Sequence, residues 1–117
     1  MLRLLRAARN TWNGLRAATH SEQAFRQELA LLAVAVPLAF VIGTDAWRRL
    51  ALIGVVLLIM IVELLNTAIE KLSDHVTLDR HPGIGRIKDM ASAAVGISLL
   101  LAGLVWLLAL AERFGLM

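Results

Sequence analysis

The chain has 117 residues, 59% of them hydrophobic, and a net charge of +3. Soluble domains contain roughly 45–50% apolar residues, so this composition and a mean hydropathy of +0.74 indicate a membrane protein with room for one domain, 1–117. The absence of cysteine excludes disulfides, thiolate metal sites and thiol redox chemistry, and the modest charge favours anionic headgroups or phosphates over nucleic acid as partners.

Residues 1–19 are predicted to form an amphipathic helix on the membrane surface. Leu5, Ala8, Trp12 and Leu15 recur at steps of three and four residues, and arginines stand between them. A basic helix of this kind typically lies in the headgroup plane with its apolar face toward the acyl chains. The arginines are spread out and no apolar core with a cleavage site follows directly, so we expect no signal peptide here.

Three apolar segments are predicted to cross the membrane as helices, at about 24–43, 50–74 and 88–111. The first has only 15 uncharged residues, 29–43, which span about 22 Å and must borrow flanking residues to cross a core of about 30 Å. The second has 20 residues, 50–69, which include Glu63 and Asn66, and the third has 22 uncharged residues, 90–111. Both are long enough to cross. The predicted fold class is therefore all-α, with a surface helix and three transmembrane helices.

Short polar segments separate these helices. Ser21 is expected to cap the first transmembrane helix, and Trp106 to mark the far membrane interface. Residues 76–87 contain Pro82, Gly83 and Gly85, so they are predicted to form a loop rich in turns. The histidines in this region have no partner at helical spacing, which argues against a zinc site.

The charges predict the orientation of the chain. Three spans place the N-terminal segment and the second loop on one side, with nine basic residues, against three on the other side. Basic residues concentrate on the cytoplasmic side of membrane proteins. The N-terminus and the second loop are therefore predicted to be cytoplasmic, in a multi-pass inner-membrane protein.

A polar stripe interrupts the second span. Glu63, Asn66, Glu70 and Asp74 lie at i, i+3, i+7 and i+11, so one face of a helix presents them all. A carboxylate near the bilayer centre costs roughly 2.5–3.5 kcal/mol on insertion scales. Such a stripe is either a polar patch that holds helices together or a working site that faces protein or water, and its spacing favours the working site.

These acids, the basic loop and the Lys88-Asp89 pair suit phosphoryl transfer, which needs a metal, cations and a base near the attacking hydroxyl. Glu63 and Glu70 are separated by about 10 Å along a helix, so one could reach a buried hydroxyl and the other a metal-nucleotide in water. The chain has neither a G-x-x-x-x-G-K-[ST] loop nor a kinase glycine loop, which excludes an ordinary nucleotide-binding fold.

Four segments in order closely resemble the small bacterial diacylglycerol kinases: WNGLRAA at 12–18, AFRQE at 24–28, ELLNTAIE at 63–70 followed by Asp74, and GRIKDMASAA at 85–94. The resemblance covers nearly the whole chain. It implies an interdigitated or domain-swapped homotrimer with sites shared between neighbouring subunits. It also implies transfer of the γ-phosphate of Mg-ATP to the hydroxyl of 1,2-diacylglycerol, which yields phosphatidic acid and ADP.

The resemblance also implies roles for individual residues. Glu63 resembles the general base and Asn66 its positioning partner, while Glu22 and Glu70 resemble the carboxylates that hold Mg²⁺ with ATP. The remaining ATP contacts would be Arg3, Asn10, Asp79, Arg80, His81, Lys88 and Asp89. The lipid would be held, together with Glu63, by Arg16, Phe25, Gln27, Glu28, Ser92 and Trp106.

Three other functions fit some of the same residues. A kinase of this family that acts on undecaprenol is the nearest. A small ion-coupled transporter would also place Glu63 in the membrane, but it would need neither Lys88-Asp89 nor a basic cytoplasmic loop. A purely structural assembly protein would leave the acids without a purpose.

Overall fold

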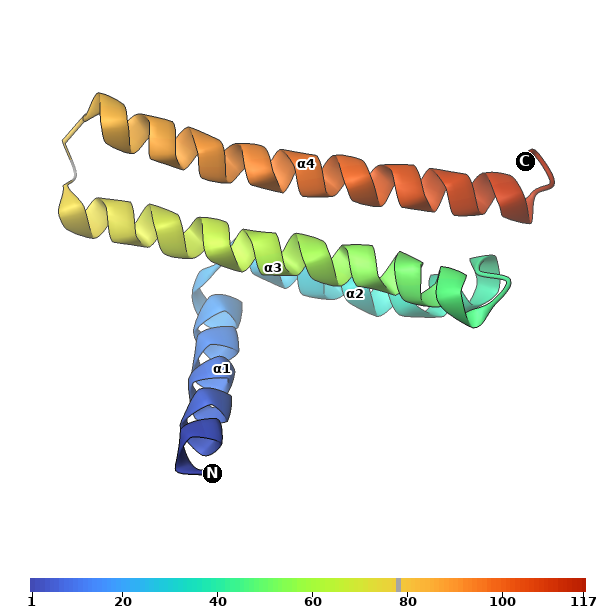
Figure 1. Ribbon diagram of the computed structural model, residues 1–117, viewed down its shortest axis with the longest axis horizontal. Helices are drawn as coiled ribbons and strands as arrows, with labels where there is room; N and C mark the ends of the chain where they lie inside the picture. The colour runs from blue at the N-terminus through green and yellow to red at the C-terminus, as the bar shows by residue number, and fades with distance from the viewer. Residues whose placement is uncertain (78) are drawn as a thin grey trace.

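The computed structural model describes residues 1–77 and 79–117, and all regular structure in them is helical (Figure 1). Four helices follow one another: α1 (Leu2–Ser21), α2 (Gln23–Ile42), α3 (Ala46–Val76) and α4 (Pro82–Arg113). The predicted all-α class, with an N-terminal helix before three long apolar helices, is confirmed.

Helix α3 is the centre of the arrangement. It packs against α4 on one side and against α2 on the other, whereas α2 and α4 contact each other little. Figure 1 shows α3 and α4 running side by side in opposite directions, with α2 covering only part of α3. Helix α1 leaves this bundle across the direction of the other three, as expected for a helix that lies on a membrane surface.

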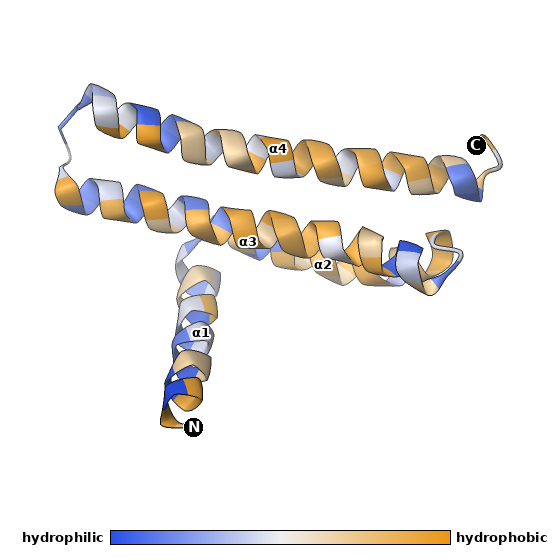
Figure 2. Cartoon of the chain, viewed as in Figure 1, coloured by the Kyte–Doolittle hydropathy of each residue, from blue (hydrophilic) through white to orange (hydrophobic). Residues whose placement is uncertain are grey.

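The helices α2, α3 and α4 are long and apolar enough to cross a membrane, by length and composition. Apolar residues run along most of their length, and polar residues gather at the bundle ends and on α1 (Figure 2). Large apolar side chains such as Phe40 and Leu104 stay more than half exposed. Such a surface is suited to contact with acyl chains.

The break between α1 and α2 differs from the prediction. Ser21 is the last residue of α1 and its Oγ donates to the carbonyl of Ala17 at 2.8 Å, so the prediction that it caps α2 is wrong. Glu22 occupies the N-cap position without a side-chain capping bond. The guanidinium of Arg26 instead donates to the last carbonyls of α1, at Thr19 and His20, and thereby satisfies them.

Helix α4 begins at Pro82, so the predicted loop 76–87 is wrong over its second half. Proline suits the first position of a helix, because its missing N–H would have no partner there. His81 supplies the cap, since its Nδ1 accepts from the backbone N–H of Gly83 at 3.0 Å. The same turn-forming residues that suggested a loop therefore start a helix.

The start of α3 is also earlier than the apolar run, because Asp45 caps it by accepting from the backbone N–H of Arg48 at 2.8 Å. This bond holds the pKa of Asp45 below its usual range. Arg48 also forms a bidentate pair with Glu112 of α4, at 3.1 and 2.9 Å. One arginine thus ties the start of α3 to the end of α4.

Two clusters of apolar residues hold the helices together. At the far end of the bundle, where α3 begins and α4 ends, Ala39, Leu52 and Ala109 are buried. Trp106 packs against them, and its Nε1 donates to the carbonyl of Leu52 at 3.1 Å. At the near end the buried residues are Ala18, Phe25 and Met60. This second cluster joins the end of α1, the start of α2 and the middle of α3, and so places α1 against the bundle.

Replacing Gly43 by alanine should destabilise the fold. The residue ends α2 with an ordinary backbone conformation, but a Cβ there would lie 2.8 Å from the carbonyl oxygen of Ala39 and 2.7 Å from Cγ of Arg49. We expect a loss of about 1–3 kcal/mol in unfolding free energy, measured by SDS titration in mixed micelles. Gly54→Ala is the matched control, because a Cβ there would meet no described atom within 4 Å apart from its chain neighbours and the backbone of its own helix. An equal loss there would contradict this account.

Candidate active site

Glu63 lies on α3 at the centre of a group of acids. It is half-buried, and the hydroxyl of Thr67, one turn further, donates to its Oε1 at 3.4 Å. The carboxylates of Glu22, Glu28 and Glu70 are all close enough to repel it. The break between α1 and α2, helix α2 and helix α3 therefore bring their acids toward one place, and of the four acids Glu63 and Glu70 lie on α3.

Asn66 holds Glu70, and the described contacts do not join it to Glu63. Its Nδ2 donates to Oε1 of Glu70 at 3.3 Å, one turn along α3. Its Oδ1 is buried and has no hydrogen-bond partner among the described residues. The amide of Asn66 therefore orients Glu70, and its own Oδ1 is left as a free acceptor beside the acids.

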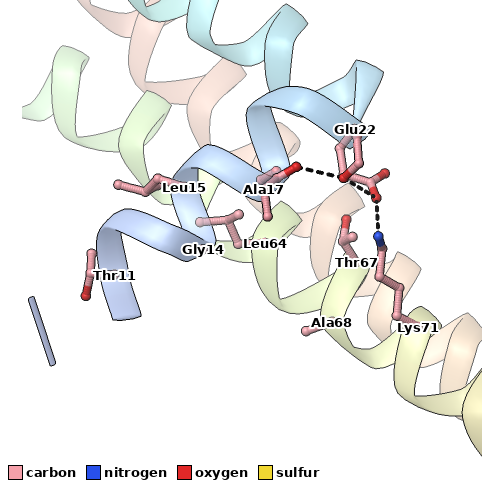
Figure 3. Close-up of a pocket in the computed structure, with 11 residues that line it drawn as sticks. Thr11, Gly14, Leu15, Ala17, Glu22, Leu64, Thr67, Ala68 and Lys71 are labelled. Atoms are coloured by element: carbon pink, nitrogen blue, oxygen red, sulfur yellow. Dashed lines mark hydrogen bonds and ion pairs between the residues drawn. The ribbon is translucent and has the colours of Figure 1, made fainter. Parts of the chain in front are cut away.

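Glu22 stands at the break between α1 and α2, where its Oε1 lies 3.0 Å from the ammonium of Lys71 on α3. Figure 3 shows this pair at one end of a cavity of about 400 Å³. The cavity lies between α1 and α3, and small and apolar side chains such as Gly14, Ala18 and Leu64 form most of its lining. The cavity thus lies beside Glu22, at the break between α1 and α2.

The acids and Asn66 offer oxygen ligands of the kind that suits a magnesium ion. Carboxylate and amide oxygens are the hard ligands that Mg²⁺ prefers, and Glu22, Glu70 and the free Oδ1 of Asn66 supply them. Over residues 1–77 and 79–117, no three acids or histidines converge closely enough to hold a metal by themselves. Mg²⁺ commonly takes one or two carboxylates and completes its shell with phosphates and water, so this open arrangement suits it.

A second polar cavity of about 420 Å³ lies where α4 begins. Four of the residues predicted to contact ATP meet there, namely Asp79, Arg80, His81 and Lys88. Lys88 also pairs with Asp74 of α3 at 2.8 Å, which joins the two helix ends across the loop. Asp89 is exposed on the next position of α4.

The structure does not bring all predicted residues to these cavities. Arg3 and Asn10 are exposed on α1, which extends away from the bundle, and no described side-chain contact joins them to the acids (Figure 1). Among the residues predicted to hold lipid, Arg16, Gln27 and Ser92 are exposed. Their roles stay predictions.

The structure shows which residues surround three other side chains that were predicted to contact the lipid. Phe25 is only 1% exposed and is a core residue of the near-end cluster. Trp106 belongs to the far-end cluster, well along α4 from the acids. Glu28 is half-buried close to Glu63, and its Oε1 has no hydrogen-bond partner among the described residues.

Two residues at the site were missed by the reading of the sequence. Thr67 follows Glu63 by four positions, a spacing that could have identified it as a hydrogen-bond partner. Lys71 directly follows Glu70, and a basic residue within a stripe of acids was the available signal. Its partner on another helix could not be read from any local spacing.

Comparisons with known proteins show the family to which the chain belongs. The family model described as prokaryotic diacylglycerol kinase matches residues 9–110. A diacylglycerol kinase of Escherichia coli (strain K12) is 45% identical over 113 residues, which cover 97% of this chain and 93% of that protein. Those of Pseudomonas aeruginosa and Haemophilus influenzae are 42% and 39% identical, over 89% and 88% of this chain and 85% and 87% of those proteins.

The family match runs from within α1 through α2 and α3 to residue 110 of α4, so its range spans Glu22, Glu28, Glu63 and Glu70. Identities of this size over nearly the whole of both chains are those of one enzyme family. The chain belongs to the prokaryotic diacylglycerol kinase family and is a lipid kinase.

Proposed function

We propose that this enzyme transfers the γ-phosphate of ATP to the free hydroxyl of 1,2-diacylglycerol, giving phosphatidic acid and ADP. Glu63 is the general base. The bond between the γ-phosphorus and the bridging oxygen of ADP breaks as a bond to the lipid oxygen forms, and the hydroxyl proton passes to the carboxylate. The transfer is direct and in line, because no side chain is needed as a covalent carrier.

The observation that carries this proposal is the depth of the acids along α3. Glu63 lies about 10 Å further into the bundle than Glu70, and within the described residues neither acid forms an ion pair with a lysine or arginine. A lipid hydroxyl at the membrane surface can approach Glu63 from the apolar side. A nucleotide in water can approach Glu70, Lys88 and the loop from the other side.

A bound Mg²⁺ would neutralise phosphate charge during the transfer. Glu22 and Glu70 would hold it, with the amide of Asn66 keeping Glu70 in place. The cavity formed by Asp79, Arg80, His81 and Lys88 would bind the rest of the nucleotide, and Lys88 would orient its phosphates. Nine basic residues on this side of the membrane support a cytoplasmic site in the inner membrane, where ATP is found.

The homotrimer expected from the resemblance remains a proposal for this chain. Many large apolar residues of α2, α3 and α4 are exposed, and either lipid or neighbouring subunits could cover them. Arg3 and Asn10, which lie away from the acids of their own chain, would then contact ATP in a neighbouring subunit. Native mass spectrometry in detergent would measure the number of chains.

A panel of lipid acceptors tests the choice of substrate. Purified protein in mixed micelles, supplied with radiolabelled ATP and Mg²⁺, should label diacylglycerol faster than undecaprenol. Faster labelling of undecaprenol would replace the proposed acceptor with the polyprenyl alcohol. Cation or proton flux into liposomes without ATP, together with no labelling of either lipid, would favour a transporter instead.

Glu63→Gln should abolish turnover and leave nucleotide binding largely intact. The amide keeps the size of the side chain but cannot take the hydroxyl proton, so we expect kcat to fall roughly 10²- to 10⁴-fold. Initial rates with diacylglycerol measure the loss, and a non-hydrolysable ATP analogue measures binding. Near-normal turnover in Glu63→Gln would remove Glu63 as the base.

Glu70→Ala should weaken binding of the metal-nucleotide complex. Removal of one carboxylate oxygen ligand should raise the Mg²⁺ concentration needed for half-maximal rate by roughly tenfold or more. Rates measured over a series of Mg²⁺ concentrations at constant ATP show this shift. An unchanged Mg²⁺ requirement with a lower maximal rate would place Glu70 outside the metal site.

A further inference from the structure

Lys71 is a cation that contacts Glu22 at the edge of the acid group, and the function proposed above assigns it no role. Its ammonium lies 3.0 Å from Oε1 of Glu22, although the two residues belong to different parts of the fold (Figure 3). The side chain of Glu22 is 28% exposed and that of Lys71 is 60% exposed. The acid is therefore held in a restricted place, while the long lysine side chain has room to move.

The nearest alternative cation on the same helix is engaged elsewhere. Arg26 follows Glu22 by one turn, the usual spacing for an ion pair. Its guanidinium instead donates to the carbonyls of Thr19 and His20 at 3.1 and 3.2 Å. Within residues 1–77 and 79–117, Lys71 is the one cation within 4.0 Å of the Glu22 carboxylate.

The position of the ammonium has a consequence for metal binding. Glu22 and Glu70 repel Glu63, so a positive charge among these acids relieves repulsion whether it comes from an ammonium or from a divalent ion. Both cannot occupy the same side of the Glu22 carboxylate. A metal that binds Glu22 through Oε1, the oxygen that Lys71 contacts, must therefore displace the ammonium from it.

The displaced ammonium would stay beside the incoming nucleotide. Lys71 directly follows Glu70 in the sequence and lines the cavity between α1 and α3. Its side chain has a flexible four-carbon stem. A phosphate oxygen carried by the metal is the nearest new anion for it. Ammonium groups bind phosphate well as point charges, and a bond to a charged group is stronger than one between neutral groups.

We propose that Lys71 is a further nucleotide-positioning residue, which holds Glu22 in place before the metal arrives and then contacts a phosphate oxygen of the metal-bound nucleotide. This inference rests on the proposed function, because it needs Glu22 to bind the metal of ATP. The lysine would have two partners, one after the other: Glu22 first and then the phosphate. It also predicts opposite effects of one substitution on two binding constants.

The test compares Lys71→Gln with the wild-type protein in detergent micelles, without turnover. Electron paramagnetic resonance of Mn²⁺ measures binding of the metal alone, and a non-hydrolysable ATP analogue with Mg²⁺ measures nucleotide binding. We expect Mn²⁺ to bind several-fold more tightly, since its competitor is gone. We expect the nucleotide to bind roughly tenfold more weakly, since one charge-assisted hydrogen bond is lost.

Two further variants make the result specific. Arg86→Gln removes a positive charge from the exposed surface of α4 and should change neither constant by more than about twofold. Lys71→Arg should restore most of the nucleotide affinity. Thermal unfolding of each variant identifies a folding defect, which would lower both affinities together.

Unchanged affinities in Lys71→Gln would overturn the inference and leave an ordinary surface ion pair, which is worth about 0–1 kcal/mol. A parallel fall of both affinities would also overturn it. The proposed function fails separately, if the wild-type protein does not phosphorylate diacylglycerol. A wild-type enzyme that is active, with a Lys71→Gln variant that binds as wild type, would refute only the role of the lysine.

Discussion

The arrangement of this enzyme depends on one apolar contact at the place where α1 leaves the bundle. Phe25 is buried against Ala18 and Met60, so the start of α2 is packed at the same time on the end of α1 and on the middle of α3. That packing sets Glu22 beside Lys71. Without it each helix could still form, but the acid at the break would have no fixed position relative to the acids on α3.

The acids at this end carry more negative charge than their neighbours neutralise. Glu63 receives one long hydrogen bond from Thr67, and Glu70 receives one from Asn66. Buried acceptor oxygens without partners are costly, and they are rare away from functional sites. Here they occur on Glu28 and Asn66 within the described chain. A divalent ion and a substrate hydroxyl would satisfy groups that the protein itself leaves open.

The opposite end of the bundle shows the contrast. Arg48 pairs with Asp45 and with Glu112, and the guanidinium matches the Glu112 carboxylate with two hydrogen bonds. Trp106 adds a hydrogen bond to a backbone carbonyl of α3. These groups satisfy one another and hold α3 to α4, so this end serves the fold. At the acid-rich end, where we propose the active site, Glu28, Glu63 and Glu70 have no such ion pair among the described residues.

The sequence by itself determined the features that depend on local periodicity. Hydropathy identified the three long apolar helices, and helical spacing placed Glu63, Asn66 and Glu70 on one face, because both signals repeat within a few residues. The start of α4 at Pro82 was missed, because proline and glycine form turns as readily as they begin helices. Only the tertiary structure decided that Glu22 pairs with Lys71 and that Lys88 pairs with Asp74. Such pairs join separate helices, and the packing of apolar side chains between those helices sets which charges meet.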